Sequence, residues 1–391
     1  MRVDKVMIRA SEEEKDLFSR AASRMGLAVA SWARMELLKV AKEQDDIAVA
    51  DKEQAEAGER GPELLSLFCG PGGLDLGFRE AGFSTRVAFD IDQDCVNTFN
   101  ANHSAGHPVA YKEDLRELTP EKVFERAGED FAPVGVIGGP PCQSFSVSNV
   151  HQSDDDPRHS LPATYARLLR LLNQKRPISF FLFENVPGLL GEKHKHRFEQ
   201  FKNLFRNAGF SIQEKVLDAK HYGVPQERER VFIVGINRKL HPRAEWRWPE
   251  PEDVVRTVRE TIGHLPEPVF NEKGMDVTAI PVHQNHWSMV PRSKKFTTPG
   301  ALQEGQSWGR SFRTLTWDAP SWTVAYGNRE VHVHPNGHRR LSMYEAMLLQ
   351  SFPHTYVLKG NISAQTRLVS EAVAPRMAWH LAVAIRRCLG L

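Results

Sequence analysis

From Leu64 onwards the sequence alternates short apolar segments with longer amphipathic ones, and this alternation limits the fold more than any other feature. The apolar segments have the length and side-chain content of strands. Strands separated by helices indicate parallel βαβ units, with helices covering both faces of one sheet. We therefore predict an α/β chain with a doubly wound, Rossmann-like sheet, whose strands are residues 64–68, 86–89, 134–137, 179–183 and 231–236.

The same patterning divides the chain into five parts. Residues 1–43 form a short α/β extension and residues 44–61 an acidic linker, before the sheet-forming part at 62–237. Residues 238–330 are rich in Pro, Trp, His and Arg and keep no sustained period, which predicts a small irregular domain. Helical patterning returns at 342–352 and 371–388, and we expect residues 331–391 to complete the sheet-forming domain.

Composition excludes several classes of protein. The 391 residues are 41% hydrophobic and 26% charged, which is ordinary for globular proteins and excludes a fibrous or wholly disordered chain. No apolar run reaches the roughly 18 residues that cross a bilayer, and the N-terminus lacks the apolar stretch of a signal peptide. The four cysteines are too few and too scattered for a disulfide framework or a metal knuckle. We expect a soluble, cytoplasmic protein without a metal.

The first strand runs into a glycine turn at residues 69–73 and then into a helix at 74–81. Glycines let the backbone approach a ligand at the helix N-terminus. Asp90 ends the next strand, where an acid receives ribose hydroxyls. Because position 75 is Asp, the G-x-G-x-x-G pattern of dinucleotide sites is absent, which disfavours NAD. The turn indicates a nucleoside-type cofactor, with a merely structural turn as the alternative.

A cysteine follows the third strand. Cys142 stands between Pro140-Pro141 and Gln143-Ser144, on a loop held by the prolines. A single cysteine is usually a small buried hydrophobe, but these neighbours argue against burial. A thiol exposed at the end of a strand is placed for nucleophilic attack.

Polar side chains also flank the two following strands. Glu184 and Asn185 come after three apolar residues, so the base of Glu184 should lie in apolar surroundings that raise its pKa and suit it to donate a proton. A structural glutamate is the alternative. Arg228 and Arg230 alternate with glutamates before the last strand; they indicate either a salt-bridged edge or a pair of guanidiniums that hold a base or a phosphate.

These segments, in this order, resemble the motifs of the cytosine-C5 methyltransferase family, from Leu64 to about Cys388. The matching segments are the glycine turn, Pro141-Cys142-Gln143, Glu184-Asn185-Val186, Gln226-x-Arg228-x-Arg230, Arg340-Leu-Ser342-x-x-Glu345-x-x-x-x-Gln350-x-Phe352-Pro353 and, more weakly, Glu371-Ala-Val-Ala-Pro375. The resemblance implies a large catalytic domain that binds S-adenosylmethionine, and a variable target-recognition region between the Arg228 and Arg340 segments.

The resemblance also implies a mechanism on double-stranded DNA. The target cytosine would be flipped out of the duplex, because its ring atoms cannot be reached within the stack. Cys142, as thiolate, would add to C6, while Glu184 would contact N3 and the exocyclic amine and supply the proton. C5 would then take the methyl group and lose its proton, and Cys142 would leave. Arg228 and Arg230 match the base-holding and loop-holding arginines, with Arg230 favoured for the base, and Asn185 would brace the site.

Two sets of binding residues follow from the resemblance. The methyl donor would lie against Phe68, Gly70, Gly72, Gly73, Asp90, Ile91, Asp114 and Pro140. The segment 143–158 would be the mobile loop that closes over DNA, with contacts from Gln143, Ser146, Ser148 and Arg158.

Two residues depart from the family pattern. Asp90 stands where Glu is usual, which gives the ribose acid a shorter reach. Glu371 stands where the family generally has Asn, and a charged residue there needs a partner, such as an arginine.

The charge distribution points to the irregular region as the surface that meets DNA. The net charge of +2 combines −2 over residues 1–60 with +4 over residues 61–391. Residues 281–317 carry five basic side chains against one acid, and six of the eight tryptophans lie between 246 and 322. We expect Trp246 and Trp248 to pack the subdomain. Candidates for phosphates or base edges are His283, His286, Arg292, Lys294, Lys295, Arg310 and Arg313.

Residues 1–43 lie outside this match. An alternating strand at 6–10, a helix that begins with the Ser11–Glu14 capping box, a Gly26 turn and a second helix at about 31–42 resemble the ribbon-helix-helix fold. In that fold two chains pair their strands, which implies a homodimer, with Lys5, Met7 and Arg9 facing the major groove. The alternative is a segment that only dimerises or docks.

The main hypothesis is therefore a site-specific DNA cytosine-C5 methyltransferase of the prokaryotic cytoplasm and nucleoid, with a restriction endonuclease as a possible partner. A tRNA cytosine-C5 methyltransferase and a DNA-binding regulator with an inactive methyltransferase fold are the alternatives.

Overall fold

The computed structural model describes residues 11–24, 28–30, 32–33, 61–103, 106–141, 161–309, 312–323 and 331–391. The chain divides into two compact units, Met1–Arg60 and Gly61–Leu391. The larger unit holds the sheet and the irregular region, and the smaller unit is the N-terminal extension.

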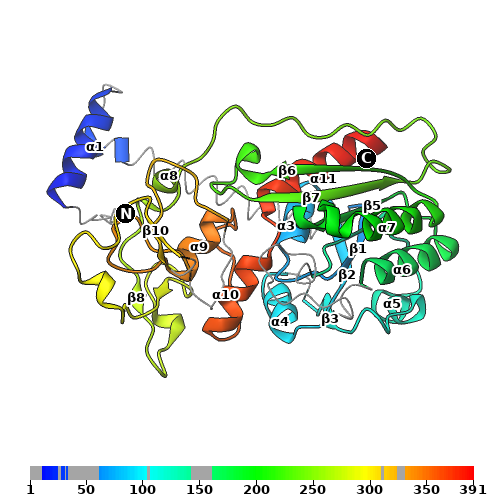
Figure 1. Cartoon of the computed structure of the whole chain (residues 1–391), viewed down its shortest axis with the longest axis horizontal. Helices are drawn as coiled ribbons and strands as arrows, with labels where there is room; N and C mark the ends of the chain where they lie inside the picture. The colour runs from blue at the N-terminus through cyan, green and yellow to red at the C-terminus, as the bar shows by residue number, and fades with distance from the viewer. Residues whose placement is uncertain are drawn as a thin grey trace, which may run out of the picture. The chain divides into compact units, whose positions relative to one another are not determined.

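The larger unit is built on a seven-stranded sheet with the order β3-β2-β1-β4-β5-β7-β6, seen edge-on at the right of Figure 1. The strands are β1 (Glu63–Leu67), β2 (Ser84–Asp90), β3 (Ala110–Lys112), β4 (Gly135–Gly138), β5 (Phe180–Asn185), β6 (Ser211–Asp218) and β7 (Glu229–Ile236). The five strands predicted from sequence are all present, and the mixed α/β fold is confirmed.

Two features of the sheet differ from the prediction. β7 pairs antiparallel with both β5 and β6, so the expectation of purely parallel pairing is wrong for this edge. β3 and β6 were not predicted at all. β3 has only three residues, and β6 lies at the sheet edge with most of its side chains exposed, so neither carries the apolar run of a buried strand.

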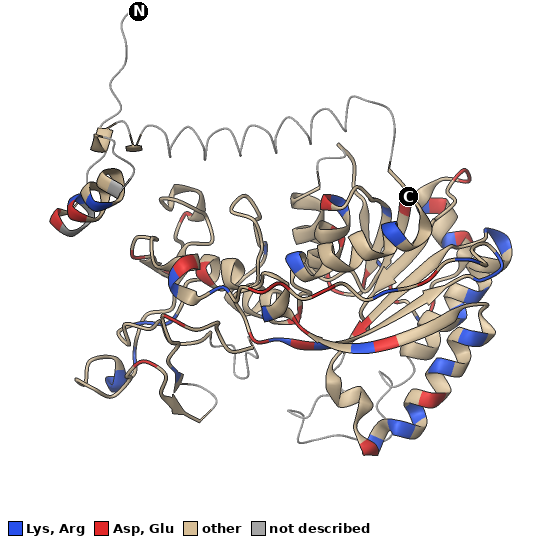
Figure 2. Cartoon of the chain, turned by 90° about the horizontal axis from the view of Figure 1, so that it is seen from above, with Lys and Arg blue, Asp and Glu red and all other residues tan. Residues whose placement is uncertain are grey.

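Helices cover both faces of the sheet because adjacent strand residues point to opposite sides. Leu65 and Val136 pack in one core with α5 (Pro120–Ala127), α6 (Leu161–Lys175) and α7 (Lys195–Asn207). Leu64 and Ile137 pack on the other face with α3 (Gly73–Glu80) and α11 (Pro375–Leu389), and α4 (Gln93–Ala101) packs there against Ala88. Figure 2 shows Lys and Arg along the flanking helices, while the strands are mostly free of charge.

The irregular region packs around a third core with two further helices. Trp287, Leu315 and Val331 are buried against α9 (Met343–Leu349) and α10 (Ile362–Glu371). The described residues of the region form α8 (Val258–Ile262), the short strands β8 (Val269–Phe270), β9 (Trp287–Ser288), β10 (Ser307–Trp308) and β11 (Phe312–Arg313), and the 3-10 helices η5 (Val277–Ala279) and η6 (Lys294–Phe296), at the left of Figure 1.

The last helices begin and end for local reasons. Ser342 and Glu345 form a capping box at the start of α9, and Asn361 caps α10. The helix expected at 371–388 corresponds to α11, which begins four residues later than expected, at Pro375, because Glu371 is the last residue of α10, a helix that the sequence did not predict. Proline disfavours helical backbone in the residue before it, which separates the two helices.

In the smaller unit, α1 (Glu12–Arg24) begins directly after Ser11, as predicted. Phe18 contacts Trp32 with ring centroids 5.6 Å apart, whereas Leu17 is 56% exposed. The predicted strand at 6–10, with Lys5, Met7 and Arg9, and Gly26 lie outside the described residues, as does most of the second predicted helix. No helix in the described part of the chain is long and apolar enough to cross a membrane.

Candidate active site

The glycine turn lies at the carboxyl end of β1 and is held by the end of β2. Phe68, Gly70 and Gly72 have positive φ angles of 53°, 54° and 90°, so the backbone turns sharply into α3. One carboxylate oxygen of Asp90 accepts a hydrogen bond from Gly70 N at 2.9 Å, and the other accepts one from Asp92 N at 2.9 Å. Burial raises the pKa of Asp90. Asp90 therefore ties the turn to β2 in this structure.

A hollow of about 360 Å³ opens where β1, β4 and β5 end. Phe68, Gly70 and Gly139 line one side, Glu184 lies at its base, and Glu371 and Val373 close it from the segment after α10. A Cβ on Gly73 would lie 2.2 Å from Val373 O, so glycine is required where the turn meets this segment. The hollow combines a backbone cradle with three carboxylates, those of Asp75, Glu184 and Glu371.

Glu184 and Arg230 form the ion pair of the site. Arg230 Nε lies 3.0 Å from Glu184 Oε1, although β5 and β7 bring these residues from distant parts of the chain. Glu184 is 7% exposed. Burial raises its pKa, as the sequence predicted, and the charges of Arg230 and Arg228 oppose the rise.

Arg228 and Arg230 bind different partners. The Arg228 side chain is 2% exposed, and its Nη2 donates to Ser370 O at 2.9 Å and to Ala372 O at 2.8 Å. Gln350 Nε2 donates to the same Ala372 oxygen at 2.7 Å. Arg228 and Gln350 therefore hold the segment that closes the hollow, and Arg230 faces the carboxylate.

Asn185 secures the entrance to the loop that carries the cysteine. Its Nδ2 donates to Pro140 O at 3.2 Å and its Oδ1 accepts from Val186 N at 2.9 Å, with the side chain 1% exposed. Pro140 is buried where β4 ends. Cys142, the loop residues Gln143, Ser146, Ser148 and Arg158, and Arg310 of the recognition region lie outside the described residues.

Comparison with known proteins gives the family. The sequence profile described as C-5 cytosine-specific DNA methylase matches residues 63–387. The chain belongs to this family. It is 32% identical to the type II methyltransferase M.MthTI of Methanothermobacter thermautotrophicus, covering 84% of this chain and 98% of that protein. It is 30% identical to M.NgoPII of Neisseria gonorrhoeae, covering 84% and 96%.

Solved structures agree with the fold. A putative DNA modification methyltransferase encoded within an Escherichia coli prophage matches with a TM-score of 0.70 at 24% identity, covering 84% of this chain and 99% of that one. Schizosaccharomyces pombe Dnmt2 matches with a TM-score of 0.57 at 17% identity. The chain is therefore a DNA cytosine-C5 methyltransferase by family, and this family uses S-adenosylmethionine as its methyl donor and double-stranded DNA as its substrate.

The residues of this methyltransferase fit such a donor. Nothing lies within 4 Å of a Cβ built on Gly70, so the turn leaves open space on that side. Ile91 is 54% exposed just beyond β2, where an adenine ring can stack on it. Asp114 follows β3 and is held by Arg116, whose Nε donates to it at 2.9 Å and whose side-chain hydrogen bonds keep the pKa of Asp114 low.

The partner of Glu371, which the sequence left open, is Arg367 of the same helix. Arg367 Nη1 lies 3.8 Å from Glu371 Oε2, and Arg367 Nη2 lies 2.7 Å from Asp92 Oδ2. The arginine thus links the closing segment of the methyltransferase to the residues that follow Ile91. Glu371 is itself a wall of the hollow.

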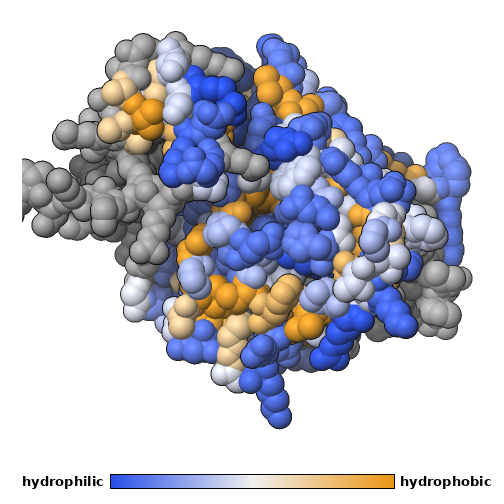
Figure 3. All heavy atoms as spheres, turned by 90° about the vertical axis from the view of Figure 1, so that its left-hand side faces the viewer, coloured by the Kyte–Doolittle hydropathy of each residue, from blue (hydrophilic) through white to orange (hydrophobic). Residues whose placement is uncertain are grey.

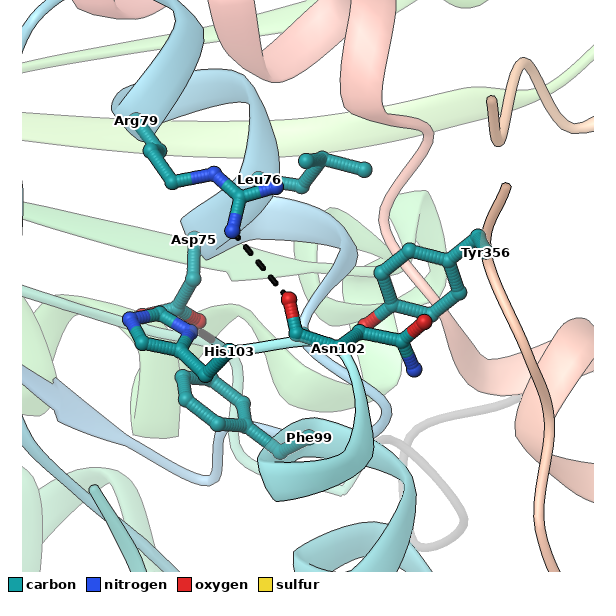
Figure 4. A pocket seen from close by; sticks show the side chains of 8 residues that line it. Asp75, Leu76, Arg79, Phe99, Asn102, His103 and Tyr356 are labelled. Atoms are coloured by element: carbon teal, nitrogen blue, oxygen red, sulfur yellow. Dashed lines mark hydrogen bonds between the residues drawn. The ribbon is translucent and has the colours of Figure 1, made fainter. Parts of the chain in front are cut away.

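Sequence reasoning missed the support behind the glycine turn. Figure 4 shows a pocket there, where Arg79 of α3 donates to the backbone oxygen of Asn102 at 3.2 Å and His103 stacks on Phe99 with ring centroids 4.9 Å apart. The Tyr356 hydroxyl donates to Pro71 O. Asp75 accepts from Ser66 and Thr85, at 2.9 Å each, and burial raises its pKa to about 6. The one available signal was an acid at position 75.

The structure sorts the aromatic and basic side chains of the recognition region. Trp246 and Trp248 have a packing role, as predicted, but they pack in the core between the sheet and α11 and not in that of the irregular region, where Trp287 is 1% exposed. Trp308 is 55% exposed. Arg292 and Lys294 are exposed, and Lys295 and Arg313 are half-buried.

The expectation for one of the two histidines of this region is wrong. His286 is 2% exposed, and its ring nitrogens contact Ser342 Oγ at 3.0 Å and Pro266 O at 2.9 Å, so its ring is internal to the recognition region. His283 is half-buried and stacks on Tyr344 at 4.3 Å, and burial lowers its pKa to about 4. The role of His283 at DNA stays a prediction.

Proposed function

We propose that this chain methylates C5 of a cytosine within one specific duplex sequence, after flipping that cytosine into the hollow where β1, β4 and β5 end. The observation that carries the proposal is the ion pair between half-buried Arg230 and buried Glu184, whose carboxylate lines the hollow. A carboxyl group with a raised pKa beside a guanidinium suits the N3 and exocyclic edge of cytosine.

The chemistry divides among a few residues. The Cys142 thiolate adds to C6 of the flipped base. Glu184 gives a proton to N3, which makes the ring accept the thiolate, and Arg230 holds the base and Glu184 in place. S-adenosylmethionine, bound against the glycine turn, supplies the methyl group that C5 takes. C5 then loses its proton and the C6–S bond breaks, which returns Cys142.

Other residues position this machinery. Arg228 holds the segment 370–372, and Asn185 holds Pro140 at the start of the cysteine loop. Phe68, Gly70, Gly72, Gly73, Ile91 and Asp114 surround the donor, and Asp90 fixes the turn that receives it. Gln143, Ser146, Ser148 and Arg158 contact DNA from the loop. The recognition region adds the basic side chains Arg292, Lys294, Lys295, Arg310 and Arg313.

Transfer of tritium from labelled S-adenosylmethionine tests the activity. We expect label in plasmid DNA at a fixed sequence, little label in tRNA, and a covalent adduct with 5-fluorocytosine DNA. Cys142→Ser should lose both turnover and adduct. Site-specific DNA binding without any transfer by the intact protein would instead identify a regulator, and equal labelling of tRNA would identify an RNA enzyme.

We also propose that the N-terminal unit pairs two chains, acting as a ribbon-helix-helix or a simpler dimerisation module. Support comes from the apolar side chains Leu17 and Val29, which are 56% and 40% exposed. Sedimentation of the full-length protein should give twice the mass of the chain, and Leu17→Glu should lower it. A monomer at micromolar concentration would refute the dimer.

A restriction endonuclease that cuts the same sequence is the partner that the type II relatives suggest, and both would act on the nucleoid in a prokaryotic cytoplasm. Cells that express the chain should carry its mark throughout the chromosome. Their DNA should resist a nuclease of that specificity, and DNA that is cut would contradict the proposal.

A further inference from the structure

We propose that the exposed indole of Trp308 stacks on a nucleobase of the recognition sequence and helps to determine which sequence is methylated. The inference rests on the proposed function, because it assigns a residue to the DNA surface of the same enzyme. The occupant of this surface is duplex DNA, in which flipping of the target cytosine uncovers the faces of the neighbouring bases.

Trp308 lies at the outer end of a column in which cations and aromatic rings alternate. Lys295 Nζ lies 4.8 Å from the centroid of the Trp308 ring and 4.7 Å from that of Phe312. The guanidinium of Arg340 lies 4.9 Å from the centroid of the same Phe312 ring and 5.8 Å from that of Phe296. Such contacts are attractive and fix the plane of the rings. The column therefore holds the indole in place without burying it.

The column is rooted in the core of the recognition region. Arg340 is 4% exposed, and its Nη1 donates to Val331 O at 2.8 Å. β10 and β11 pair antiparallel, and the hairpin continues through the bond from Thr314 N to Gln306 O at 2.8 Å. Leu315, next along the chain, is 1% exposed. A side chain on this hairpin is thus presented by a fixed element.

A packing role does not explain Trp308. Its exposed fraction is 55%, against 1% for Trp287 and 7% for Trp246. Among the exposed large hydrophobic side chains of the described residues it is the only tryptophan. Figure 3 shows apolar patches set among hydrophilic side chains on the side of the molecule that faces left in Figure 1.

The charges around the hairpin favour a nucleic acid as that partner. Arg292, Lys294, Lys295 and Arg313 are its described basic neighbours in sequence. The acid of this stretch, Glu304, is engaged within the protein, since its Oε1 accepts a hydrogen bond from Trp317 N at 2.5 Å. Basic side chains position the backbone of DNA, and an aromatic face among them reads or stacks on bases.

Contacts connect the hairpin to the catalytic strand. The Arg313 guanidinium lies 6.0 Å from the ring of Trp322. The segment around Trp322 runs beside residues 226–227, with a bond from Glu227 N to Ser321 O at 2.8 Å. These residues lead directly into β7 and Arg230. The hairpin is therefore braced against the strand that holds the flipped base.

Trp308→Ala, Trp308→Phe and the control Phe270→Ala test the inference. Phe270 is a partly exposed aromatic, at 41%, on the separate β8–β9 pair of the same region. The recognition sequence is first read by bisulfite sequencing of DNA from cells that express the wild type. Duplexes with this sequence, and with each single-base change, then serve as substrates.

Base stacking on an aromatic is worth roughly 5- to 150-fold in affinity. We expect Trp308→Ala to lose a factor in this range in kcat/KM on the cognate duplex and to discriminate less at one base position. Trp308→Phe should recover much of the loss. Phe270→Ala should stay within about twofold of the wild type.

Two readouts keep the result interpretable. Calorimetric affinity for S-adenosylmethionine should be unchanged in Trp308→Ala, which shows that the variant is folded. Cognate activity within twofold of the wild type would overturn the inference, and so would an equal loss on every sequence, which indicates a backbone contact. A wild type that transfers no methyl group would overturn the proposed function instead.

Discussion

Arg230 Nε lies 3.0 Å from Oε1 of Glu184, and this contact joins two antiparallel strands of the sheet beside the hollow where β1, β4 and β5 end. Burial favours the neutral carboxylic acid, and the guanidinium favours the carboxylate. The balance sets the pKa of the group that we expect to protonate cytosine N3. It also means that changing Arg230 alters the proton donor as well as the grip on the base.

Loss of Arg230 should therefore change a pH profile. Activity that needs protonated Glu184 falls as the pH rises through its pKa. Arg230→Gln removes the charge that opposes the burial effect, so the alkaline limb of kcat should move to higher pH while kcat falls about 10²-fold or more. Arg230→Lys, which keeps the charge, should move the limb less. A loss of kcat with an unmoved limb would contradict the pairing.

Arg228 should behave as a positioning residue. Arg228→Ala leaves Ser370 O and Ala372 O without their guanidinium donor in a buried place, which costs about 2–4 kcal/mol in the free energy of unfolding. Because segment 370–372 borders the hollow, affinity for S-adenosylmethionine should fall as well. Urea denaturation and calorimetry measure the two effects. Arg247→Ala, an exposed control, should change neither; a stable Arg228→Ala would refute the role.

The contact of Arg367 with Asp92 should contribute more to donor binding than its contact with Glu371 does. The contact to Glu371 is 3.8 Å long and half exposed, so Glu371→Asn should change unfolding by less than about 0.5 kcal/mol. Arg367→Ala also removes the partner that lies 2.7 Å from Asp92, next to Ile91, on which we expect the adenine of the donor to stack. We expect it to weaken donor binding more than Glu371→Asn does, as measured by calorimetry. The opposite ranking would show that Glu371 itself holds the donor.

Asp75 should make stability depend on pH. Its pKa rises from 3.8 to about 6 on folding, so the folded chain holds this proton more tightly than the unfolded chain. Its contribution is complete below pH 4 and is lost as the pH rises through about 6, for a total near 3 kcal/mol. Asp75→Asn removes this dependence. The wild type should therefore lose stability relative to the variant between pH 4 and pH 7, so that the urea midpoint of the variant minus that of the wild type increases. A constant difference would refute the shift.

Local patterns were sufficient for much of the fold and for the identity of the site residues. Buried strands β1, β2, β4, β5 and β7 carry apolar runs, and polar residues at their ends are visible directly in the sequence. The two strands that escaped prediction lack such runs, since β3 is short and β6 is largely exposed. The sequence also predicted the wrong environment for His286, because a buried histidine with two hydrogen-bond partners has no local signature.

The sequence by itself determined which residue types stand at the strand ends, because the burial of a strand shows as a pattern of apolar and polar residues that are adjacent in the chain. Only the tertiary structure decided what those residues touch. The antiparallel placement of β7 brings Arg230 to Glu184 and sends Arg228 to segment 370–372. Asp90 turns to Gly70, and Arg367 joins Glu371 to Asp92. These contacts join residues whose pairing depends on how the strands and helices pack, which no local pattern encodes.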